Sequence, residues 1–180
     1  MAKTQIPSAE SCAYVVGDDG ISRWSETHAD AWIGLIQTQR NLTRELDAEL
    51  ESKHGLGLSA LELLGRLAAA EHRQLRLSVL AEQTGLSLSR VSRIVDTMET
   101  RKLVARHACE SDGRAVNAVL TEQGLVLVRE AQATHFEGVR ERFFEHLEPD
   151  EIATLAAIFG RFAPGAAEQC TEALAPDAPA

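Results

Sequence analysis

The sequence lacks a long apolar segment, because none of its apolar runs approaches the roughly 18 residues that a membrane span needs. It also lacks a basic and then apolar leader, since SAESCAYVVGDDG is too polar and its apolar core is too short. These absences argue against a membrane or secreted protein, and a cytoplasmic protein is the simplest interpretation. A chain of 180 residues with 44% hydrophobic content fits one domain with extensions.

Cysteine is also scarce. Cys12, Cys109 and Cys170 are an odd number without a C-x-x-C pair, which argues against a disulfide framework or a structural zinc site. The six histidines are scattered without an i, i+4 pair, so we expect neither a metal nor a cofactor. Ser-His-Asp ordering, a glycine-rich phosphate loop and clustered carboxylates are missing too, so the sequence does not support an enzyme.

The segment LSVLAEQTGLSLSRVSRIVDTMETRKLV has the spacing of a helix-turn-helix. Ala81 is small enough for two helices to pack closely, Gly85 provides the positive φ of a tight turn, and Val91 is the first core contact of the second helix. The segment therefore predicts two short helices that meet at Gly85.

Two serines precede the apolar-periodic runs of these helices. Ser78 and Ser87 are predicted N-caps, which places the helices at about 79–84 and 88–100. In the second helix, residues spaced by three and four form one buried stripe. They are Val91, Ile94, Val95 and Met98.

The opposite face of the second helix carries short hydroxyls and guanidinium groups without a bulky apolar residue. With the N-cap Ser87 they are Ser89, Arg90, Ser92, Arg93, Thr97 and Arg101. Such a face suits the major groove of DNA, where arginine bridges guanine O6 and N7 and serine or threonine reaches bases or phosphates. The alternative is a solvated helix face without a partner.

A β-hairpin is predicted directly behind this helix. Leu103–Cys109 has a strand-like pattern, ESDGR forms a turn, and Ala115–Leu120 returns as a second strand. Asp112, Gly113 and Arg114 lie at or near the tip, where an exposed arginine can enter an adjacent minor groove and the aspartate can orient it or cap the turn. The order of helices and hairpin predicts a winged helix.

These motifs resemble the central segment of the MarR family (multiple antibiotic resistance regulators) from about Gly55 to Gly124, including HGLGLSALELLGRLA and the block SDGRAVNAVLTEQG. The resemblance implies a mainly α fold with a small β-hairpin wing, comprising a winged helix-turn-helix DNA-binding domain and a helical dimerisation domain. It also implies a homodimeric repressor or activator of a double-stranded, pseudo-palindromic operator. Such regulators often release DNA on binding a small aromatic or phenolic effector.

The sequence departs from the family pattern at two positions. Lys102 replaces the glycine that commonly precedes the first wing strand, so the recognition helix has to end without a left-handed glycine. Gly113 replaces a commoner charged residue in the wing, which removes one phosphate contact.

The charge is unevenly distributed. The whole chain has a net charge of −9, whereas residues 75–120 contain seven basic and five acidic residues, or +2, which leaves −11 for the remainder. Acidic flanks repel phosphate over a Debye length of about 8 Å. We therefore expect weak non-specific binding and a steep salt dependence at the operator.

The flanks predict long amphipathic helices. Asp30–Leu50 and Thr121–Leu147 each carry an apolar stripe, with Thr121 as N-cap of the second, and Pro149 begins a last helix to about Phe162. The stripes could form an intramolecular three-helix core, but a dimer is favoured because an operator reader needs two copies about 34 Å apart. The expected regions are an N-terminal extension at 1–25, a dimerisation region at 26–53 and 121–163, the winged domain at 54–120 and a mobile tail at 164–180.

The resemblance also implies an effector pocket between the dimer helices and the winged domain. Its candidate wall residues are Trp32, Ile36, Leu63 and Leu67, and Arg40 or His72 could meet an anionic group. For Trp32 a place in the core is the favoured interpretation.

Three functions are compatible with these patterns. The leading one is a ligand-released repressor, and the first alternative is a winged-helix protein of nucleoid architecture or protein contact, without a specific operator. The second alternative is a redox-responsive regulator that uses Cys109 near Arg106, although a buried cysteine in a strand is favoured.

Overall fold

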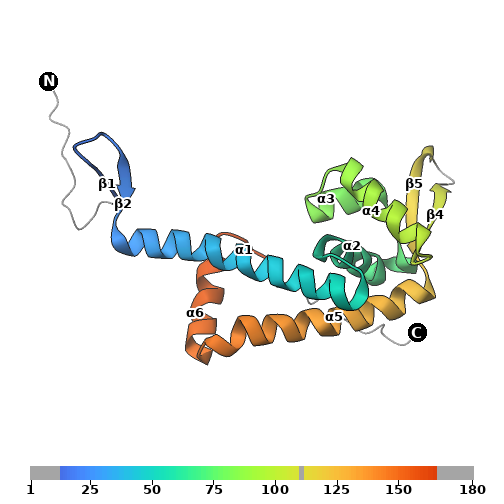
Figure 1. The fold of residues 1–180 in the computed structure, drawn as a ribbon. Helices are drawn as coiled ribbons and strands as arrows, with labels where there is room; N and C mark the ends of the chain where they lie inside the picture. Colours follow the sequence, from blue (N-terminus) through green and yellow to red (C-terminus); the bar gives the residue numbers. More distant parts are fainter. Residues whose placement is uncertain (1–12, 110–111, 166–180) are drawn as a thin grey trace, which may run out of the picture. The chain divides into compact units, whose positions relative to one another are not determined.

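The computed structural model describes residues 13–109 and 112–165 (Figure 1). Contacts divide the chain into two units, Met1–Arg44 and Glu45–Ala180, which are described separately. The described residues include no helix that combines the length and the apolar character needed to cross a membrane.

The first unit begins with a β-hairpin that the sequence analysis did not predict. Strand β1 (Tyr14–Val16) pairs antiparallel with β2 (Ser22–Trp24), with Tyr14 opposite Trp24. Gly20 has a φ of 74° in the connecting turn, and Arg23 forms an ion pair with Asp19 at 2.6 Å. Each of these strands has only three residues, which is too short for a recognisable alternation of apolar and polar residues.

Helix α1 spans Glu26–His54 and contributes to both units. It is longer than the predicted 30–50, and its buried residues, Leu46 and Leu50, both belong to the second unit. Trp32 is 54% exposed, so its favoured assignment to the core is wrong for a single chain.

The second unit has the core of the molecule. Helices α2 (Leu58–Ala69), α3 (Leu77–Thr84) and α4 (Leu88–Thr100) pack their apolar faces together. Asp47 Oδ1 accepts the backbone N–H of Leu58 at 2.7 Å and so caps the start of α2. A short 3₁₀ helix, Glu71–Arg73, connects α2 to the sheet.

The wing is part of a three-stranded antiparallel sheet of order β3-β5-β4. It consists of β3 (Gln74–Arg76), β4 (Val104–Cys109) and β5 (Asp112–Leu120). The two wing strands were predicted, but β5 begins at Asp112 and not at Ala115, so residues 112–114 belong to the strand and not to the predicted turn. Strand β3 was not predicted. Because β3 leads directly into α3, the N-cap of α3 is Arg76 and not Ser78, which lies inside the helix.

Helix α4 ends through Lys102, which has a φ of 60°. The Lys102 N–H donates to Glu99 O at 2.8 Å and the Leu103 N–H to Met98 O at 2.9 Å, the two bonds of a Schellman motif. A lysine thus takes the left-handed position that glycine commonly fills, and buried Leu103 lies in the same apolar core as Met98.

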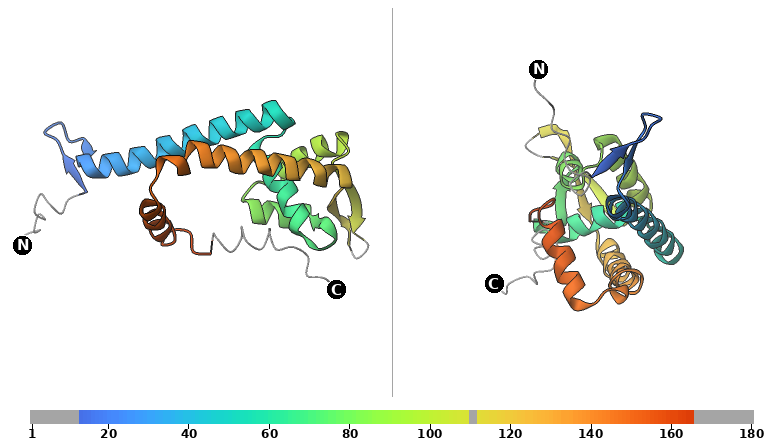
Figure 2. Two further views of the ribbon diagram at one scale, coloured as in Figure 1. Left: turned by 90° about the horizontal axis from the view of Figure 1, so that it is seen from below. Right: turned by 90° about the vertical axis from the view of Figure 1, so that its left-hand side faces the viewer.

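Helix α5 (Glu122–Arg142) begins at the predicted N-cap, since Thr121 Oγ1 accepts the Gly124 N–H at 3.0 Å. A 3₁₀ helix, Phe144–His146, joins it to α6 (Pro149–Phe159). Figure 1 and the left view of Figure 2 show α6 turning off the end of α5 that is far from the wing. Helix α6 begins at Pro149 as predicted but ends at Phe159, before the expected Phe162.

Candidate nucleic-acid interface

The helix-turn-helix presents α4 at the surface of the second unit. Gly85 ends α3 in the left-handed conformation with a φ of 67°, as the turn requires. Ser87 Oγ then accepts the Arg90 N–H at 3.3 Å, which confirms Ser87 as N-cap. Val91 and Val95 are buried against the core, so the polar side of α4 is directed outward.

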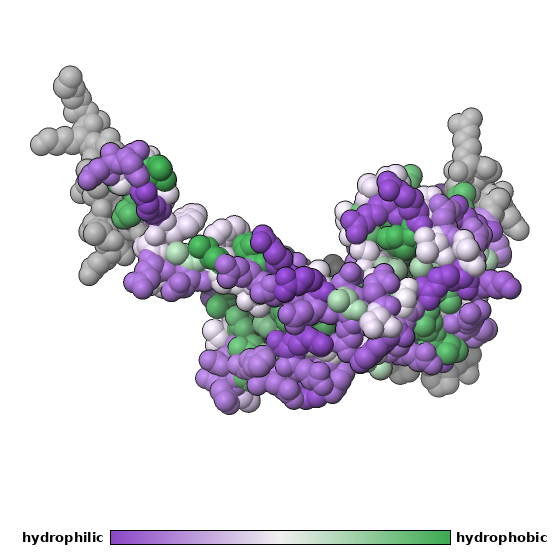
Figure 3. Space-filling model, viewed as in Figure 1, coloured by the Kyte–Doolittle hydropathy of each residue, from purple (hydrophilic) through white to green (hydrophobic). Residues whose placement is uncertain are grey.

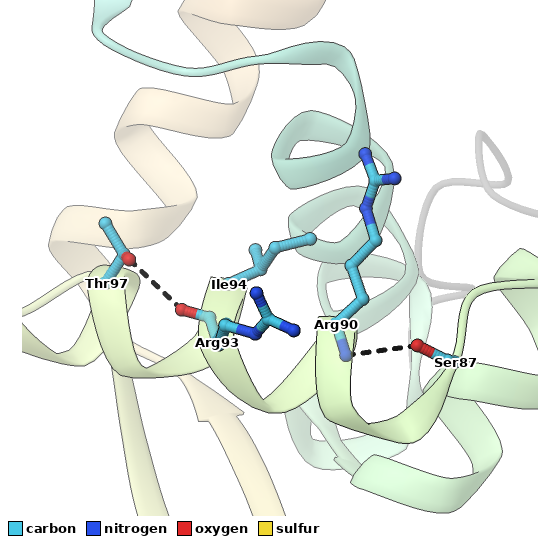
Figure 4. A pocket seen from close by; sticks show the side chains of 5 residues that line it. All are labelled: Ser87, Arg90, Arg93, Ile94 and Thr97. Atoms are coloured by element: carbon cyan, nitrogen blue, oxygen red, sulfur yellow. Dashed lines mark hydrogen bonds between the residues drawn. The ribbon is translucent and has the colours of Figure 1, made fainter.

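This polar side borders a hollow of about 510 Å³. Its lining residues are Ser87, Arg90, Arg93, Ile94 and Thr97, which Figure 4 shows along successive turns of α4. The hollow therefore lies on the face that the sequence assigns to DNA.

The polar side chains differ in what holds them. Arg90 Nη2 donates to Ser59 Oγ of α2 at 3.2 Å, and Thr97 Oγ1 donates to Arg93 O at 3.1 Å. Ser89 Oγ lies 3.1 Å from Ser87 Oγ. Among the described residues, the guanidinium of Arg93 has neither a hydrogen-bond partner nor an ion-pair partner, so all its donors are available to a ligand.

Arg106 of β4 connects the wing to α4, a role that sequence reasoning missed. Its Nη1 lies 2.7 Å from Asp96 Oδ1, and its Nη2 donates to Ser92 O at 3.0 Å and to Ser92 Oγ at 3.1 Å. Glu99 Oε2 is 3.8 Å from Nε. A basic residue in a strand gives no sequence signal for contacts with a helix that precedes it in the chain.

Arg101, at the end of α4, contacts the backbone at the end of α1. Its guanidinium donates to His54 O at 2.9 Å and to Gly55 O, so it joins the end of α4 to the end of α1. The side chain of His54 in turn lies 2.8 Å from Thr134 Oγ1 of α5. In the described structure Arg101 thus connects two helix ends, and the base or phosphate contact expected from the sequence stays a prediction.

The tip of the wing is only partly described. The backbone of Asp112 and Arg114 belongs to β5, but their side chains and that of Cys109 lie outside the described part of the structure, as do residues 110–111. The predicted roles of these three side chains therefore remain predictions.

The expected effector residues are divided between the two units of the chain, and they do not line the hollow on α4. Leu63 and Leu67 are 1% and 0% exposed in the core of the second unit, whereas the side chain of His72 is 85% exposed. Trp32, Ile36 and Arg40 belong to the exposed first unit. A second hollow of about 320 Å³ instead has both acidic and basic lining residues, among them Asp47, Glu51 and Arg90.

Known proteins share this architecture. A family model described as the MarR family matches residues 54–115. The HTH-type transcriptional repressor MdtR of Bacillus subtilis (strain 168) is 26% identical over 117 residues, which are 65% of this chain and 75% of that protein.

Two solved structures from Streptomyces coelicolor are also similar. AbsC, a MarR family transcriptional regulator, is 35% identical with a TM-score of 0.71, over 78% of this chain and 95% of that one. Sco3205, a MarR family transcriptional regulator in complex with DNA, is 30% identical with a TM-score of 0.73, over 79% of this chain and 90% of that one. The winged helix-turn-helix and these similarities together show that the chain belongs to the MarR family of transcriptional regulators.

Proposed function

We propose that the protein is a dimeric, sequence-specific repressor that a small ligand releases from a pseudo-palindromic operator. The exposed face of α4, with the unpaired guanidinium of Arg93 beside a hollow of about 510 Å³, is the observation that carries this proposal.

The polar face of α4 would enter the major groove of double-stranded DNA. Arg93 has the free donors needed to bridge guanine O6 and N7, and the exposed hydroxyls of Ser89 and Thr97 can reach bases or phosphates. Arg90 would have to exchange its bond to Ser59 for a phosphate or base. In this arrangement Arg114 of the wing enters the neighbouring minor groove, with Asp112 beside it.

Two copies would pair through the helices at 26–53 and 121–163. Large apolar side chains of these helices are exposed in a single chain, and their burial between copies would place two α4 helices on successive major grooves. They include Trp32, Ile33, Leu35, Phe136, Ile158 and Phe159.

We further propose that the protein represses transcription and that a small molecule releases it from DNA. The similarity to MdtR, which is named a transcriptional repressor, supports the repressor role. The similarity to Sco3205, which was solved in complex with DNA, supports DNA binding. A small aromatic or phenolic effector would contact Trp32, Ile36 and Arg40, which a single chain leaves exposed. Leu63 and Leu67 would join such a site only if the core around α2 opened.

Selection of bound duplexes from a random or genomic pool tests the function. We expect enrichment of a pseudo-palindrome with half-site centres about 10 base pairs apart, and adding phenolic compounds to the selected complex would then screen for effectors. An unenriched pool with weak, salt-labile binding would favour the nucleoid or protein-contact alternative.

The selected duplex also permits a test of Arg93. Arg93→Ala should weaken operator binding by about 1–3 kcal/mol and relax base preference, because a bidentate guanine contact is lost. Arg161→Ala removes the same charge outside the winged domain and should leave affinity within a factor of two. Equal losses for Arg93→Ala on cognate and scrambled duplexes in fluorescence anisotropy would exclude base reading.

A further inference from the structure

The N-terminal hairpin has an apolar face that nothing in its own unit covers. Tyr14 and Trp24 are cross-strand partners whose rings meet edge to face, with centroids 6.3 Å apart. Side chains two residues apart in a strand share a face, so Val16 lies on the same side as Tyr14. Tyr14, Val16 and Trp24 are 54%, 61% and 49% exposed, and we call them the aromatic face.

The opposite face of the hairpin is different. It presents Val15 opposite Arg23, and the Arg23 guanidinium pairs with Asp19 at the turn. The hairpin is therefore amphipathic, with charge on one side and two aromatic rings on the other. Figure 3 shows apolar side chains at its surface.

This hairpin cannot be stable through contacts within its own unit. Among residues 13–44, the described part of the first unit, every side chain is exposed or only half-buried. A two-stranded hairpin is marginally stable in water unless its apolar face packs on something. The ordered strand register thus points to a packing partner for the aromatic face.

We infer that the aromatic face docks on a second copy of this chain, as an arm that extends the dimer interface. The inference rests on the proposed dimer and adds to it a contact outside the long helices. The Ser25 N–H donates to Ala13 O at 2.9 Å where β2 leads into α1, so the hairpin continues directly into the exposed apolar stripe of α1.

The exposed apolar area of the hairpin and of α1 is consistent with a second copy of the chain as the partner. A stable interface takes about 800 Å² from each partner, and an aromatic side chain can bury roughly 150–250 Å². With about half of each ring system exposed, Tyr14, Trp24 and Trp32 would contribute on the order of 300 Å². The exposed Val16, Ile33 and Leu35 add to this area.

Adjacent valines provide a matched test. Val16→Thr changes the aromatic face and Val15→Thr the charged face, by the same substitution at similar exposure. We expect sedimentation velocity to show a dimer dissociation constant raised several-fold by Val16→Thr and unchanged by Val15→Thr. The double variant Tyr14→Ser/Trp24→Ser should raise it at least tenfold.

A fluorescence probe keeps the inference testable if that double variant does not fold. The sequence has two tryptophans, so Trp32→Phe leaves Trp24 alone. Its emission should shift to shorter wavelength over the concentration range in which dimers form. An emission that stays constant through dimerisation, or that shifts only when operator DNA is added, would overturn the arm.

The outcomes distinguish failure of the proposed arm from failure of the proposed dimer. If the unaltered chain sediments as a monomer at every concentration, the proposed dimer fails and the arm with it. If it dimerises with the same constant in all hairpin variants, only the arm is wrong.

Discussion

Arg106 links the wing to α4, the helix whose polar face we propose to contact DNA. Its side chain is 26% exposed and lies between the wing strand and the acidic side chains of α4, Asp96 and Glu99. By pairing with them it reduces the negative charge that α4 presents toward phosphate. Arg106 is thus a positioning residue that acts through α4.

Arg106→Ala should reduce both stability and operator affinity. Loss of the bonds to Ser92 and Asp96 should lower the free energy of unfolding by about 1–3 kcal/mol, measured by urea denaturation. The freed carboxylates should weaken DNA binding further. In an Asp96→Asn/Glu99→Gln background, the effect of Arg106→Ala on DNA affinity should therefore be smaller. An equal loss in both backgrounds would indicate that Arg106 itself contacts DNA.

Single residues also show where sequence reasoning was effective. Ser87, Thr121 and Pro149 were located correctly because capping depends on side chains within a few positions of the helix start. The contacts of Arg101 with the end of α1, and of Arg106 with α4, join segments far apart in sequence or in separate elements. Local spacing carries no information on such pairs, so the polar residues of α4 could be found but not sorted into DNA-facing and positioning groups.

At the level of elements, two glycines in helices differ in whether a Cβ atom would fit at their position. A Cβ on Gly124 would clash with Leu103 O and would lie 2.7 Å from Leu120 Cδ1, because the start of α5 packs on the sheet. A Cβ on Gly65 of α2 would have Gln132 Nε2 as its nearest atom, at an ordinary 3.6 Å.

Substitution by alanine should therefore change the free energy of unfolding in opposite directions at these two positions. Gly124→Ala should lower the free energy of unfolding by about 1–3 kcal/mol through overpacking. Gly65→Ala should raise it by roughly 0.5–1 kcal/mol, since alanine loses less backbone entropy in a helix. Chemical denaturation of both variants measures this, and a stabilised Gly124→Ala would show that α5 can move away from Leu103 without cost.

Most of the elements followed from apolar periodicity. The helix at 88–100 and both wing strands were predicted, because each has either a stripe or a turn signal. Strands β1, β2 and β3 were missed, since three residues are too few to establish a period of two. The missed β3 also explains the error at Ser78: the chain enters α3 directly from a paired strand.

At the level of the whole molecule, we expect the charge distribution to limit the affinity of the protein for DNA of arbitrary sequence. Residues 75–120 have a net charge of +2 and the rest of the chain has −11, which gives −9 for the whole chain. Operator binding should therefore lose affinity steeply between about 50 and 200 mM salt, and scrambled DNA should bind weakly throughout.

Removal of acidic charge from the flanks should reduce the difference in affinity between operator and scrambled DNA. Asp30→Asn/Glu130→Gln should raise affinity for scrambled duplex a few-fold and leave the salt slope at the operator unchanged, because no phosphate contact is added. Anisotropy titrations at several salt concentrations measure both quantities. A changed operator slope would place one of these side chains at the DNA backbone.

The bonds from Arg101 to the end of α1, together with the contact between His54 and Thr134, join α4 to both long helices of the second unit. These contacts hold α4, the end of α1 at residues 45–54 and α5 against one another, so we expect that α4 does not rotate by itself to follow a displaced half-site. We therefore expect the protein to bind an operator whose half-sites are one base pair further apart only if the duplex twists or bends. The elastic cost of that deformation depends on the central base pairs, so the protein would discriminate among spacer sequences that it never touches.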